Sequence, residues 1–381
     1  MAVLAEAKGT YRKGGDGADR SNDRKVPLSA EDAWIDAVDI EAFKRDVREL
    51  GEELKKGQGE EDNAHLRKMI WCSNFCSFVG FFSSGVVPYY ALFPAVMLSL
   101  GITTRWTMIA HHVCHGGYDN CDKSGRFNRF KFAVKSLWRR VNDWFDWMLP
   151  EAWNVEHNML HHYHLGEQSD PDLVERNLEW LRMTKMPLIL KYAIVGFFMI
   201  TWKWSYYASN TFKELRVKEM RKSNPKELQK ALDAAASRGG FDLSQPLLAL
   251  DFFTKPLPQW LRMSDFLLRG VGPYFFYRFI IFPAPWIALG YLIDAADPFS
   301  FFKCSVLTCV LADMFANVHS FIIVVTNHAG DDLYKFGTKC KAGSATFYLR
   351  QVVSSANFAA GTDCIDFFHG WLNYQIEHHL L

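Results

Sequence analysis

The chain has 381 residues, with 43 Lys and Arg against 42 Asp and Glu and a net charge of +1. This balance excludes a strongly basic nucleic-acid-binding protein and an acidic tail protein. Aromatic residues make up 15% of the chain, and long apolar stretches alternate with polar ones. That alternation is typical of a membrane protein whose spans are joined by large polar connections. The eight cysteines form no CxxC pair, which favours reduced thiols over a disulfide framework.

The N-terminal part of the chain begins polar and then becomes strongly apolar. Residues 1–30 are rich in Gly, Asp, Lys, Arg and Ser and contain no apolar core of signal-peptide length, which predicts a disordered leader. The charged residues 31–68 predict a cytosolic helix. The apolar stretch 69–110, broken at 85–88, supplies two spans of roughly 20 residues each. This hairpin returns the chain to its starting side, where the first histidine cluster begins.

Residues 128–150 carry apolar side chains at helical spacing, and Lys131, Lys135, Arg139 and Arg140 occupy other faces. This pattern predicts a helix lying in the membrane interface. An amphipathic helix that packs on a soluble core is the alternative.

Three further apolar segments follow, at 187–209, 272–293 and 300–327. Histidine clusters before and after them can share one site only if an even number of crossings separates the clusters. The segment 187–209 contains Lys191 and Lys203, and the latter lies in a Trp-Lys-Trp motif typical of the interface. We therefore expect this segment to lie on the membrane surface.

The sequence thus predicts an all-α integral membrane protein. Its four transmembrane helices form two hairpins, accompanied by interfacial helices and a cytosolic histidine-rich di-metal domain. The Lys- and Arg-rich connection 210–271 falls on the cytosolic side, as the positive-inside rule prefers. The predicted spans are about 69–87, 89–110, 272–293 and 300–327.

Nine of the thirteen histidines fall in three short clusters, within residues 111–115, 157–164 and 378–379. Residues four apart share a helix face, which pairs His111 with His115 and His157 with His161, with His162 beside the latter pair. Such a number of imidazoles exceeds what one tetrahedral zinc can use. The clusters therefore predict a pair of metal ions, and iron with open positions for O2 is the reactive choice.

A single His-x-x-x-His pair can also arise by chance in a polar patch at a membrane boundary. Three clusters that the predicted topology places on one side of the membrane favour a shared metal site instead.

The pattern HxxxH, HxxxHH and QxxHH, spaced among paired spans, resembles the membrane fatty acid desaturase family from about residue 70 to the end. The closing stretch 370–379 is especially close to the third histidine box of the front-end and acyl-lipid branches. The resemblance implies a non-haem di-iron centre, O2 as co-substrate and electrons from cytochrome b5 or ferredoxin. By position, the resemblance implies these metal ligands: His111, His115, His157, His161, His162, His328, Gln375, His378 and His379. Gln375 stands where other branches place a histidine.

The chain departs from the family pattern in several places. The first box lacks the Asp that usually follows its first histidine, so His112 could replace His111. His164 is extra, and we expect it outside the ligand set. The motif His-Pro-Gly-Gly is absent, which implies that the electron donor is a separate protein. Relatives continue past Leu381 into a further cytosolic segment. One interpretation is therefore that this chain is an incomplete gene product.

Ligand imidazoles need carboxylate or carbonyl acceptors that fix their tautomers. The sequence places these candidates near the boxes without choosing among them: Asp119, Glu156, Asp170, Asp172, Asp363, Asp366 and Glu377.

We therefore predict an O2-dependent di-iron desaturase of a fatty acyl chain, carried by a lipid or by CoA. The endoplasmic reticulum is the expected membrane, with a plastid membrane as the alternative. Two other functions stay open, a membrane di-iron hydroxylase of a lipid or sterol and a non-catalytic metal-binding membrane protein.

Overall fold

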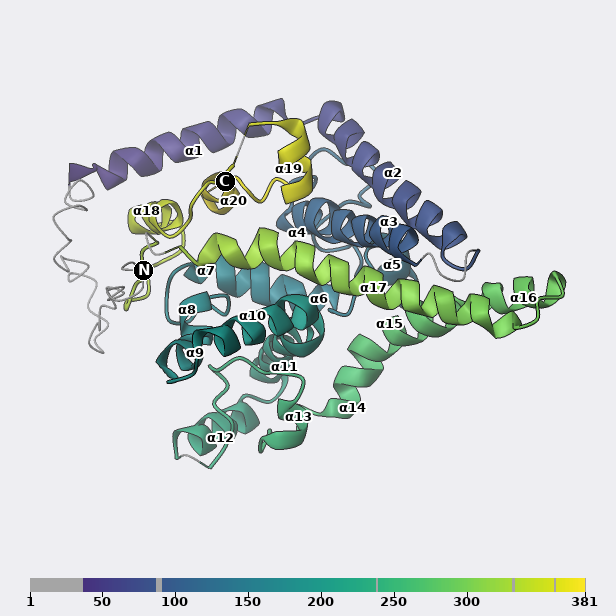
Figure 1. The fold of residues 1–381 in the computed structure, drawn as a ribbon. Helices are drawn as coiled ribbons and strands as arrows, with labels where there is room; N and C mark the ends of the chain where they lie inside the picture. Colours follow the sequence, from purple (N-terminus) through teal and green to yellow (C-terminus); the bar gives the residue numbers. More distant parts are fainter. Residues whose placement is uncertain (1–36, 87–90, 238, 331–332, 360, 381) are drawn as a thin grey trace. The chain divides into compact units, whose positions relative to one another are not determined.

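The computed structural model describes residues 37–86, 91–237, 239–330, 333–359 and 361–380 (Figure 1). These residues are helical or irregular and contain no strand; a single isolated bridge pairs Glu167 with Phe336. The predicted all-α class is therefore confirmed. The predicted disordered leader, residues 1–30, lies outside the described part of the chain.

The chain divides into two compact units. Of the described residues, those within Gly59–Met159 and Met183–Ile323 form the larger unit, and those within Met1–Gln58, Leu160–Arg182 and Val324–Leu381 form the smaller unit. The helices that lie wholly or mostly in the larger unit are α2 (Glu60–Ser83), α3 (Leu92–Thr103), η2 (Thr104–Ala110), α4 (His111–His115), α5 (Leu137–Asp143), α6 (Pro150–Trp153), η3 (Asn154–His161), α10 (Leu188–Trp202), η4 (Lys203–Tyr207), α11 (Ala208–Ser223), α12 (Pro225–Ala236), α13 (Asp251–Thr254), α14 (Met263–Asp265), η5 (Phe266–Val271), α15 (Gly272–Phe276), η6 (Tyr277–Ile281), α16 (Ala284–Leu292) and α17 (Pro298–Val324). The last two residues of η3, among them His161, and the last residue of α17 belong to the smaller unit.

The helices of the smaller unit come from three distant parts of the chain. They are α1 (Ile40–Gly57), α7 (His162–His164), α8 (Val174–Asn177), α9 (Glu179–Met183), the 3-10 helix η7 (Val325–His328), α18 (Ala345–Val353), α19 (Asp363–His369) and α20 (Gln375–Leu380). Helix α18 contacts both α1 and α20. The smaller unit therefore joins the N-terminal helix α1, the histidines at 161–164 and the C-terminal histidines in one folded body.

Four helices are long and apolar enough to cross a membrane: Leu92–His115, Leu188–Ser223, Met263–Leu292 and Pro298–His328. Their number agrees with the predicted four, but the members differ. The predicted interfacial segment 187–209 lies in one of them. The predicted span 69–87 lies largely in α2, whose first turn is acidic, and α2 is not among the four. Which of these helices cross the bilayer stays a prediction.

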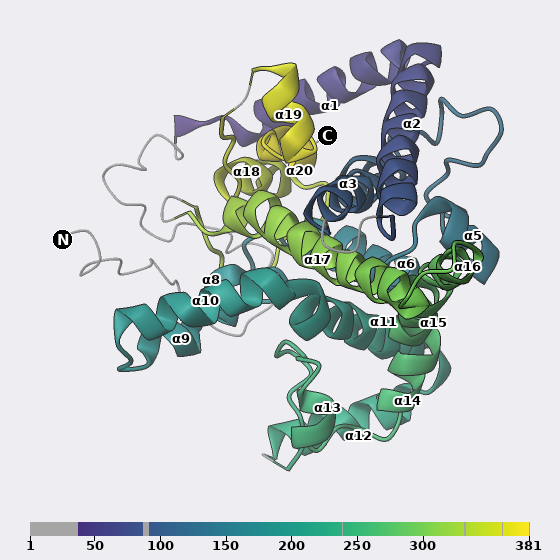
Figure 2. The ribbon, with the colours of Figure 1, turned by 45° about the vertical axis from the view of Figure 1, so that its right-hand side comes forward.

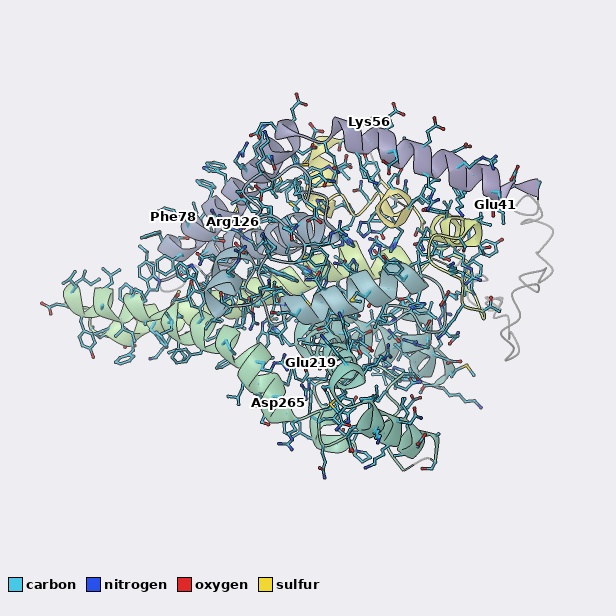
Figure 3. The ribbon with its side chains drawn as sticks, turned by 180° about the vertical axis from the view of Figure 1, so that it is seen from behind. Glu41, Lys56, Phe78, Arg126, Glu219 and Asp265 are labelled. Carbon is cyan, nitrogen blue, oxygen red and sulfur yellow. The ribbon has the colours of Figure 1, made fainter. Side chains whose placement is uncertain are left out.

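Helix α2 nevertheless presents an apolar stripe to its surroundings. Trp71, Phe75, Phe78 and Phe82 are all exposed, and their spacing of four, three and four residues puts them on one helix face. Figure 3 shows Phe78 directed outward from α2. Large aromatic side chains in such a stripe are suited to lipid, which supports the predicted membrane contact of this helix.

The Lys203 side chain is not exposed, as its Trp-Lys-Trp motif suggested, but buried. It is buried at the junction of α10 and η4, and its Nζ lies 3.0 Å from the Asp146 carboxylate. The Lys203 backbone N–H donates to the side chain of Asn317 on α17. A buried lysine is tolerated because an opposite charge compensates its lost hydration. These contacts of Lys203 attach the continuous helix α10–η4 to the rest of the larger unit.

The prediction of an interfacial helix over residues 128–150 is wrong for most of that range. Within it, only α5 (Leu137–Asp143) and the first residue of α6 are helical. Ala133 and Lys135 have positive φ values of 57° and 76°, which no α-helix contains. The buried carboxylate of Asp143 accepts a hydrogen bond from the Ala133 N–H at 3.1 Å and pairs with Arg126. These contacts give the turn an alternative to helical hydrogen bonding, which helical periodicity could not indicate.

The core of the larger unit lies between close-packed helices. Small residues let α2 and α3 approach, because a Cβ added at Gly80 would lie 2.6 Å from the Leu98 side chain. Both views of the ribbon show α2 and α3 side by side (Figures 1 and 2). A buried cluster joins α3, α15, η6 and α17 through Ala95, Leu98, Tyr274, Phe279, Cys309 and Ala312. This packing positions the C-terminal end of the α3–α4 helix, where the first histidines stand.

Candidate metal centre

Three histidine side chains of the larger unit converge, and we call them the first cluster. His111 and His115 stand on α4, and His157 stands on the π-helical segment η3. The Nε2 atom of His111 lies 3.0 Å from Nε2 of His157 and 3.1 Å from Nε2 of His115. One ring nitrogen of each residue lies within 4.8 Å of the others. Because a neutral imidazole binds transition metals through a ring nitrogen, these three form a donor set for one ion.

The first cluster is held by neighbours that the sequence did not single out. Buried Trp153 stacks on His157 with ring centroids 4.5 Å apart and an interplanar angle of 23°. Trp144 meets Trp153 edge to face at 5.6 Å. The Asn158 side chain donates to the Cys114 carbonyl at 2.8 Å and so ties η3 to α4. These contacts fix the three imidazoles before any ion binds.

Five histidines of the smaller unit form the second cluster. Ring centroids of His161 and His328 lie 4.7 Å apart, and those of His161 and His379 lie 5.0 Å apart. His162 lies 4.4 Å from His379 and 4.8 Å from His378. One ring nitrogen of each of His161, His328 and His379 falls within 4.8 Å of the others, and so does the set His162, His378 and His379. Residues from η3, α7, η7 and α20 are thus brought to one place.

A buried carboxylate orients His161. Oδ1 of Asp170 lies 2.9 Å from Nδ1 of His161, and Oδ2 accepts a hydrogen bond from the Gly166 N–H. Burial disfavours the charged forms of both groups, but their mutual attraction outweighs it, so the pKa of His161 is raised and the pKa of Asp170 is lowered. A carboxylate on Nδ1 keeps the proton there and leaves Nε2 as the atom for metal binding. Asp170 is one of the seven carboxylates proposed from the sequence.

The C-terminal histidines are positioned by a turn between α19 and α20. Helix α19 ends at Gly370, whose φ of 63° is the left-handed conformation that glycine adopts without strain. The buried Asp366 carboxylate accepts from the Asn373 side chain at 2.7 Å. Asn327, beside His328, donates to the Leu372 carbonyl at 3.1 Å. The end of the last long helix and the third box are therefore joined within one unit.

Glu167 links the second box to the C-terminal part of the chain, and sequence reasoning missed it. This buried carboxylate accepts hydrogen bonds from His164 Nδ1, the Cys340 N–H and Arg350, at 2.8, 2.9 and 3.1 Å respectively. Arg350, also buried, stacks over the Phe336 ring at 4.2 Å. The contacts join residues more than 170 positions apart in sequence, so local spacing carried no signal for them. The extra His164 thus contacts a carboxylate, outside both clusters.

Eight of the nine predicted ligands lie in the two clusters, and Gln375 does not. The Gln375 side chain is buried, and its Nε2 donates to the Leu372 carbonyl at 2.7 Å. Its Oε1 has no hydrogen-bond partner among the described residues, so an oxygen remains available to a metal or a water. His112 belongs to neither cluster, which favours His111 as the ligand from the first box.

A carboxylate oxygen of Asp172 also lies within 4.8 Å of a ring nitrogen of His161. Three of the other carboxylates proposed from the sequence have different partners. Asp119 pairs with Arg129 at 2.5 Å, Glu377 accepts from Asn357, and Glu156 accepts from Tyr207 at 3.4 Å. Asp366 accepts a hydrogen bond from Asn373 and so stabilises the turn before α20, as described above. The sequence therefore named the carboxylate that contacts His161 but could not separate it from those with other roles.

The residues present fit a pair of transition-metal ions. Both ring nitrogens of His379 are buried and have no hydrogen-bond partner within the described chain. Burial, followed by the neighbouring His162 and His161, lowers the pKa of His379 well below its ordinary value. A buried polar group without a partner is costly, and a neutral imidazole is the form that binds metal. The donor chemistry of both clusters is therefore that of a metal centre.

Comparison with known proteins agrees with this chemistry. The family model described as "Fatty acid desaturase" matches residues 88–381, which cover all the histidines of both clusters. The chain is 24% identical over 350 residues to the NADPH-dependent stearoyl-CoA 9-desaturases of two Mycobacterium tuberculosis strains, CDC 1551 / Oshkosh and ATCC 25618 / H37Rv. The match covers 90% of this chain and 68% of each relative. No solved structure matches the chain.

Proposed function

The chain belongs to the fatty acid desaturase family, and from this premise we propose that it is an O2-dependent di-iron enzyme that introduces a double bond into a fatty acyl chain. The substrate chain would be carried by a lipid or by CoA. The observation that carries the proposal is the convergence of eight histidines into two clusters. Ring nitrogens lie within 4.8 Å of one another in the first cluster and in each of two overlapping sets of three in the second. The mycobacterial relatives, named as stearoyl-CoA desaturases, support an acyl substrate.

Iron held by these histidines would activate O2 for attack on an unactivated C–H bond. The substrate loses two hydrogen atoms from neighbouring carbons, and O2 is reduced to two water molecules. The balance requires two further electrons and two protons. The electrons would come from a separate donor protein, cytochrome b5 or ferredoxin, and the protons from solvent.

The chain's own residues would hold and orient the centre. His111, His115 and His157 would bind one ion, and His161, His162, His328, His378 and His379 the other. Asp170 would retain the proton on Nδ1 of His161, which directs Nε2 to the metal. Gln375 would contribute its buried Oε1, directly or through a water.

The protein would work as an integral membrane enzyme. Its four long apolar helices support membrane insertion, and a membrane is where acyl lipid substrates lie. We propose the endoplasmic reticulum as the membrane, with a plastid membrane as the alternative.

A lipid profile tests the proposal. The chain is expressed in a heterologous host that supplies cytochrome b5 or ferredoxin, and double-bond positions are read by mass spectrometry. The matched control is His161→Ala, expressed to the same level in the membrane. We expect a new unsaturated acyl species that is absent from the control.

Two other results of the lipid profile would indicate a different function. New hydroxylated lipid that depends on His161 would make the protein a membrane hydroxylase, because oxygen had been transferred to the carbon. An unchanged profile, with folded protein that contains no iron, would overturn the catalytic proposal and leave a membrane protein of another role.

A further inference from the structure

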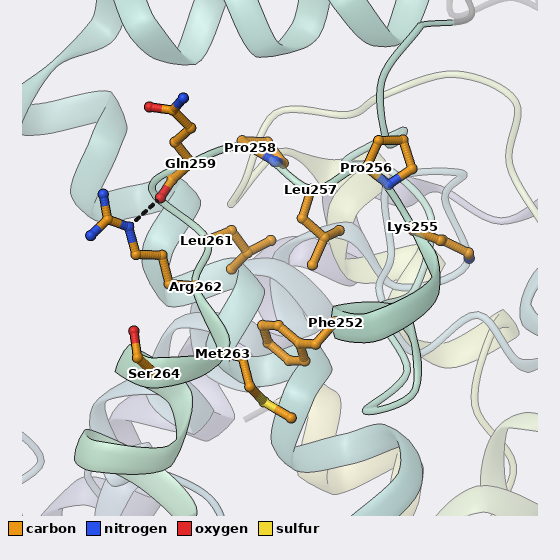
Figure 4. Close-up of a pocket in the computed structure, with 10 residues that line it drawn as sticks. All are labelled: Phe252, Lys255, Pro256, Leu257, Pro258, Gln259, Leu261, Arg262, Met263 and Ser264. Carbon is orange, nitrogen blue, oxygen red and sulfur yellow. Dashed lines mark hydrogen bonds between the residues drawn. The ribbon is translucent and has the colours of Figure 1, made fainter.

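An open hollow lies in the larger unit, just before the helix Met263–Leu292. Its volume is about 570 Å³. Figure 4 shows that its wall is formed by α13, α14 and the segment between them. The lining residues are Phe252, Lys255, Pro256, Leu257, Pro258, Gln259, Leu261, Arg262, Met263 and Ser264. They combine apolar side chains with two cations and include no carboxylate.

The two cations are not equivalent. Lys255 Nζ lies 3.1 Å from the buried carboxylate of Asp251, so its charge is already compensated. Arg262 has no ion pair among the described residues, and its Nε donates to the Gln259 carbonyl at 2.7 Å (Figure 4). The two terminal amino groups of Arg262 make no hydrogen bond within the described chain. The net positive charge of the hollow therefore resides on the Arg262 guanidinium, whose terminal amino groups remain available to a ligand.

Hydrogen bonds from α11 hold the backbone next to Arg262 in place. Nε and Nη2 of Arg216 on α11 both donate to the Trp260 carbonyl, at 3.1 and 2.9 Å. Trp260 and Leu261 are buried, whereas Arg262 is exposed. The Nε hydrogen bond to Gln259 further restricts the guanidinium. A ligand that binds there would lose little affinity to ordering of the loop.

The surroundings of the hollow are those of a bilayer surface. Phe253 and Leu268 are 74% and 77% exposed, on the elements that precede and follow the lining segment. Met263, in the wall, is also the first residue of a helix long and apolar enough to span a membrane. Exposed apolar side chains next to cations at a span terminus are typical of headgroup depth.

We propose that this hollow binds the phosphate of a membrane phospholipid with an anionic headgroup, and that Arg262 is its principal donor. The planar guanidinium matches phosphate oxygens with two parallel N–H donors, and Lys255 stands in the same wall as a second cation. The apolar lining residues accommodate the glycerol and the start of the acyl chains. The site requires membrane insertion but does not depend on the desaturase activity.

Native mass spectrometry of the full chain, purified with iron, tests the site. The protein in detergent is mixed with equal amounts of phosphatidylglycerol and phosphatidylcholine, and retained lipid is counted for wild type and Arg262→Gln. We expect preferential retention of phosphatidylglycerol by the wild type and about a tenfold weaker retention in the variant. Arg262→Lys, which keeps the charge but loses the planar fork, should fall between them.

Arg221→Gln is the matched control, because Arg221 is an exposed arginine on α11 that does not line the hollow. It should retain phosphatidylglycerol as the wild type does. Equal retention of the two lipids, or an equal loss in both arginine variants, would overturn the site. Displacement of the bound lipid by millimolar inorganic phosphate would show a general anion site and would overturn the lipid assignment. Iron content is measured in parallel, and it should be the same in all variants.

Discussion

Asp170 and His161 form a buried pair in which a carboxylate oxygen lies 2.9 Å from Nδ1 of the imidazole. The two residues are nine positions apart, and the turn between them brings the carboxylate back onto the ring. The pair explains how one histidine of a crowded cluster can present a defined nitrogen. It also links the candidate metal centre to the loop that contains Glu167, because Asp170 accepts a hydrogen bond from the Gly166 N–H.

Replacing Asp170 by Asn should weaken metal binding without unfolding the protein. The amide can still accept from Nδ1, but it loses the charge that favours this tautomer. We expect iron affinity to fall about 10- to 100-fold, the usual range for partners of metal-bound histidine. Affinity is measured by competition with a chelator, with Asp363→Asn as the control because Asp363 is exposed. Equal affinities in the two variants would contradict this role of Asp170.

Removing the charge of Glu167 should destabilise the smaller unit. Glu167→Gln leaves Arg350 buried without its carboxylate, and such a loss typically costs about 3–5 kcal/mol. The midpoint of thermal unfolding in detergent should fall accordingly. The double variant Glu167→Gln with Arg350→Met should be less destabilised than the sum of the single variants, since neither charge is then left alone. Simple additivity would show that the two side chains do not interact.

The contribution of Glu167 should also depend on pH. Burial raises its pKa, but contacts with His164, the Cys340 N–H and Arg350 outweigh burial and lower the pKa overall. A lowered pKa means that the stabilisation is fully present above the ordinary glutamate pKa and is lost as pH falls through the lowered value. The difference in unfolding midpoint between wild type and Glu167→Gln should therefore shrink in acid. A difference that stayed constant as pH fell well below the ordinary glutamate pKa would refute this.

Asp146 should be needed to keep Lys203 inside the larger unit. Asp146→Asn removes the carboxylate 3.0 Å from Nζ and leaves a buried ammonium without an opposite charge. A destabilisation of about 3–5 kcal/mol is expected, and it should be relieved when Lys203→Met is added. Circular dichroism during thermal unfolding provides the measurement. If Asp146→Asn unfolds like wild type, Lys203 must reach water by another route.

The sequence predicted the parts of the site that depend on local spacing. His111 and His115, four residues apart, share one cluster because they lie on one short helix. His157 and His161 show the limit of that reasoning, because both lie on the π-helical segment η3. His157 lies against His111, whereas His161 lies against His328 and His379. His328 has no neighbouring histidine, and only the family resemblance indicated it.

Features that depend on distant contacts were not predictable. Glu167 looked like an ordinary surface carboxylate until the fold placed Arg350 beside it, 183 positions away. Asp143, by accepting a hydrogen bond from the Ala133 N–H, stopped an amphipathic pattern from becoming a continuous helix. The Trp-Lys-Trp motif around Lys203 is typical of an interface residue. Its buried partner Asp146 lies 57 positions upstream, so the local sequence did not indicate the ion pair. In each case a tertiary partner overrode a correct reading of the local pattern.

The most direct test of the metal centre is the iron content of the purified chain and of two single variants. His115→Ala removes a ligand of the first cluster only, and His379→Ala removes one of the second. We expect about two iron ions per chain in the wild type and about one in each variant, because each cluster would hold its own ion. Folding of the variants is checked by circular dichroism. Folded wild-type protein that takes up no iron, or variants that both keep the wild-type amount, would contradict a di-iron centre built from these histidines.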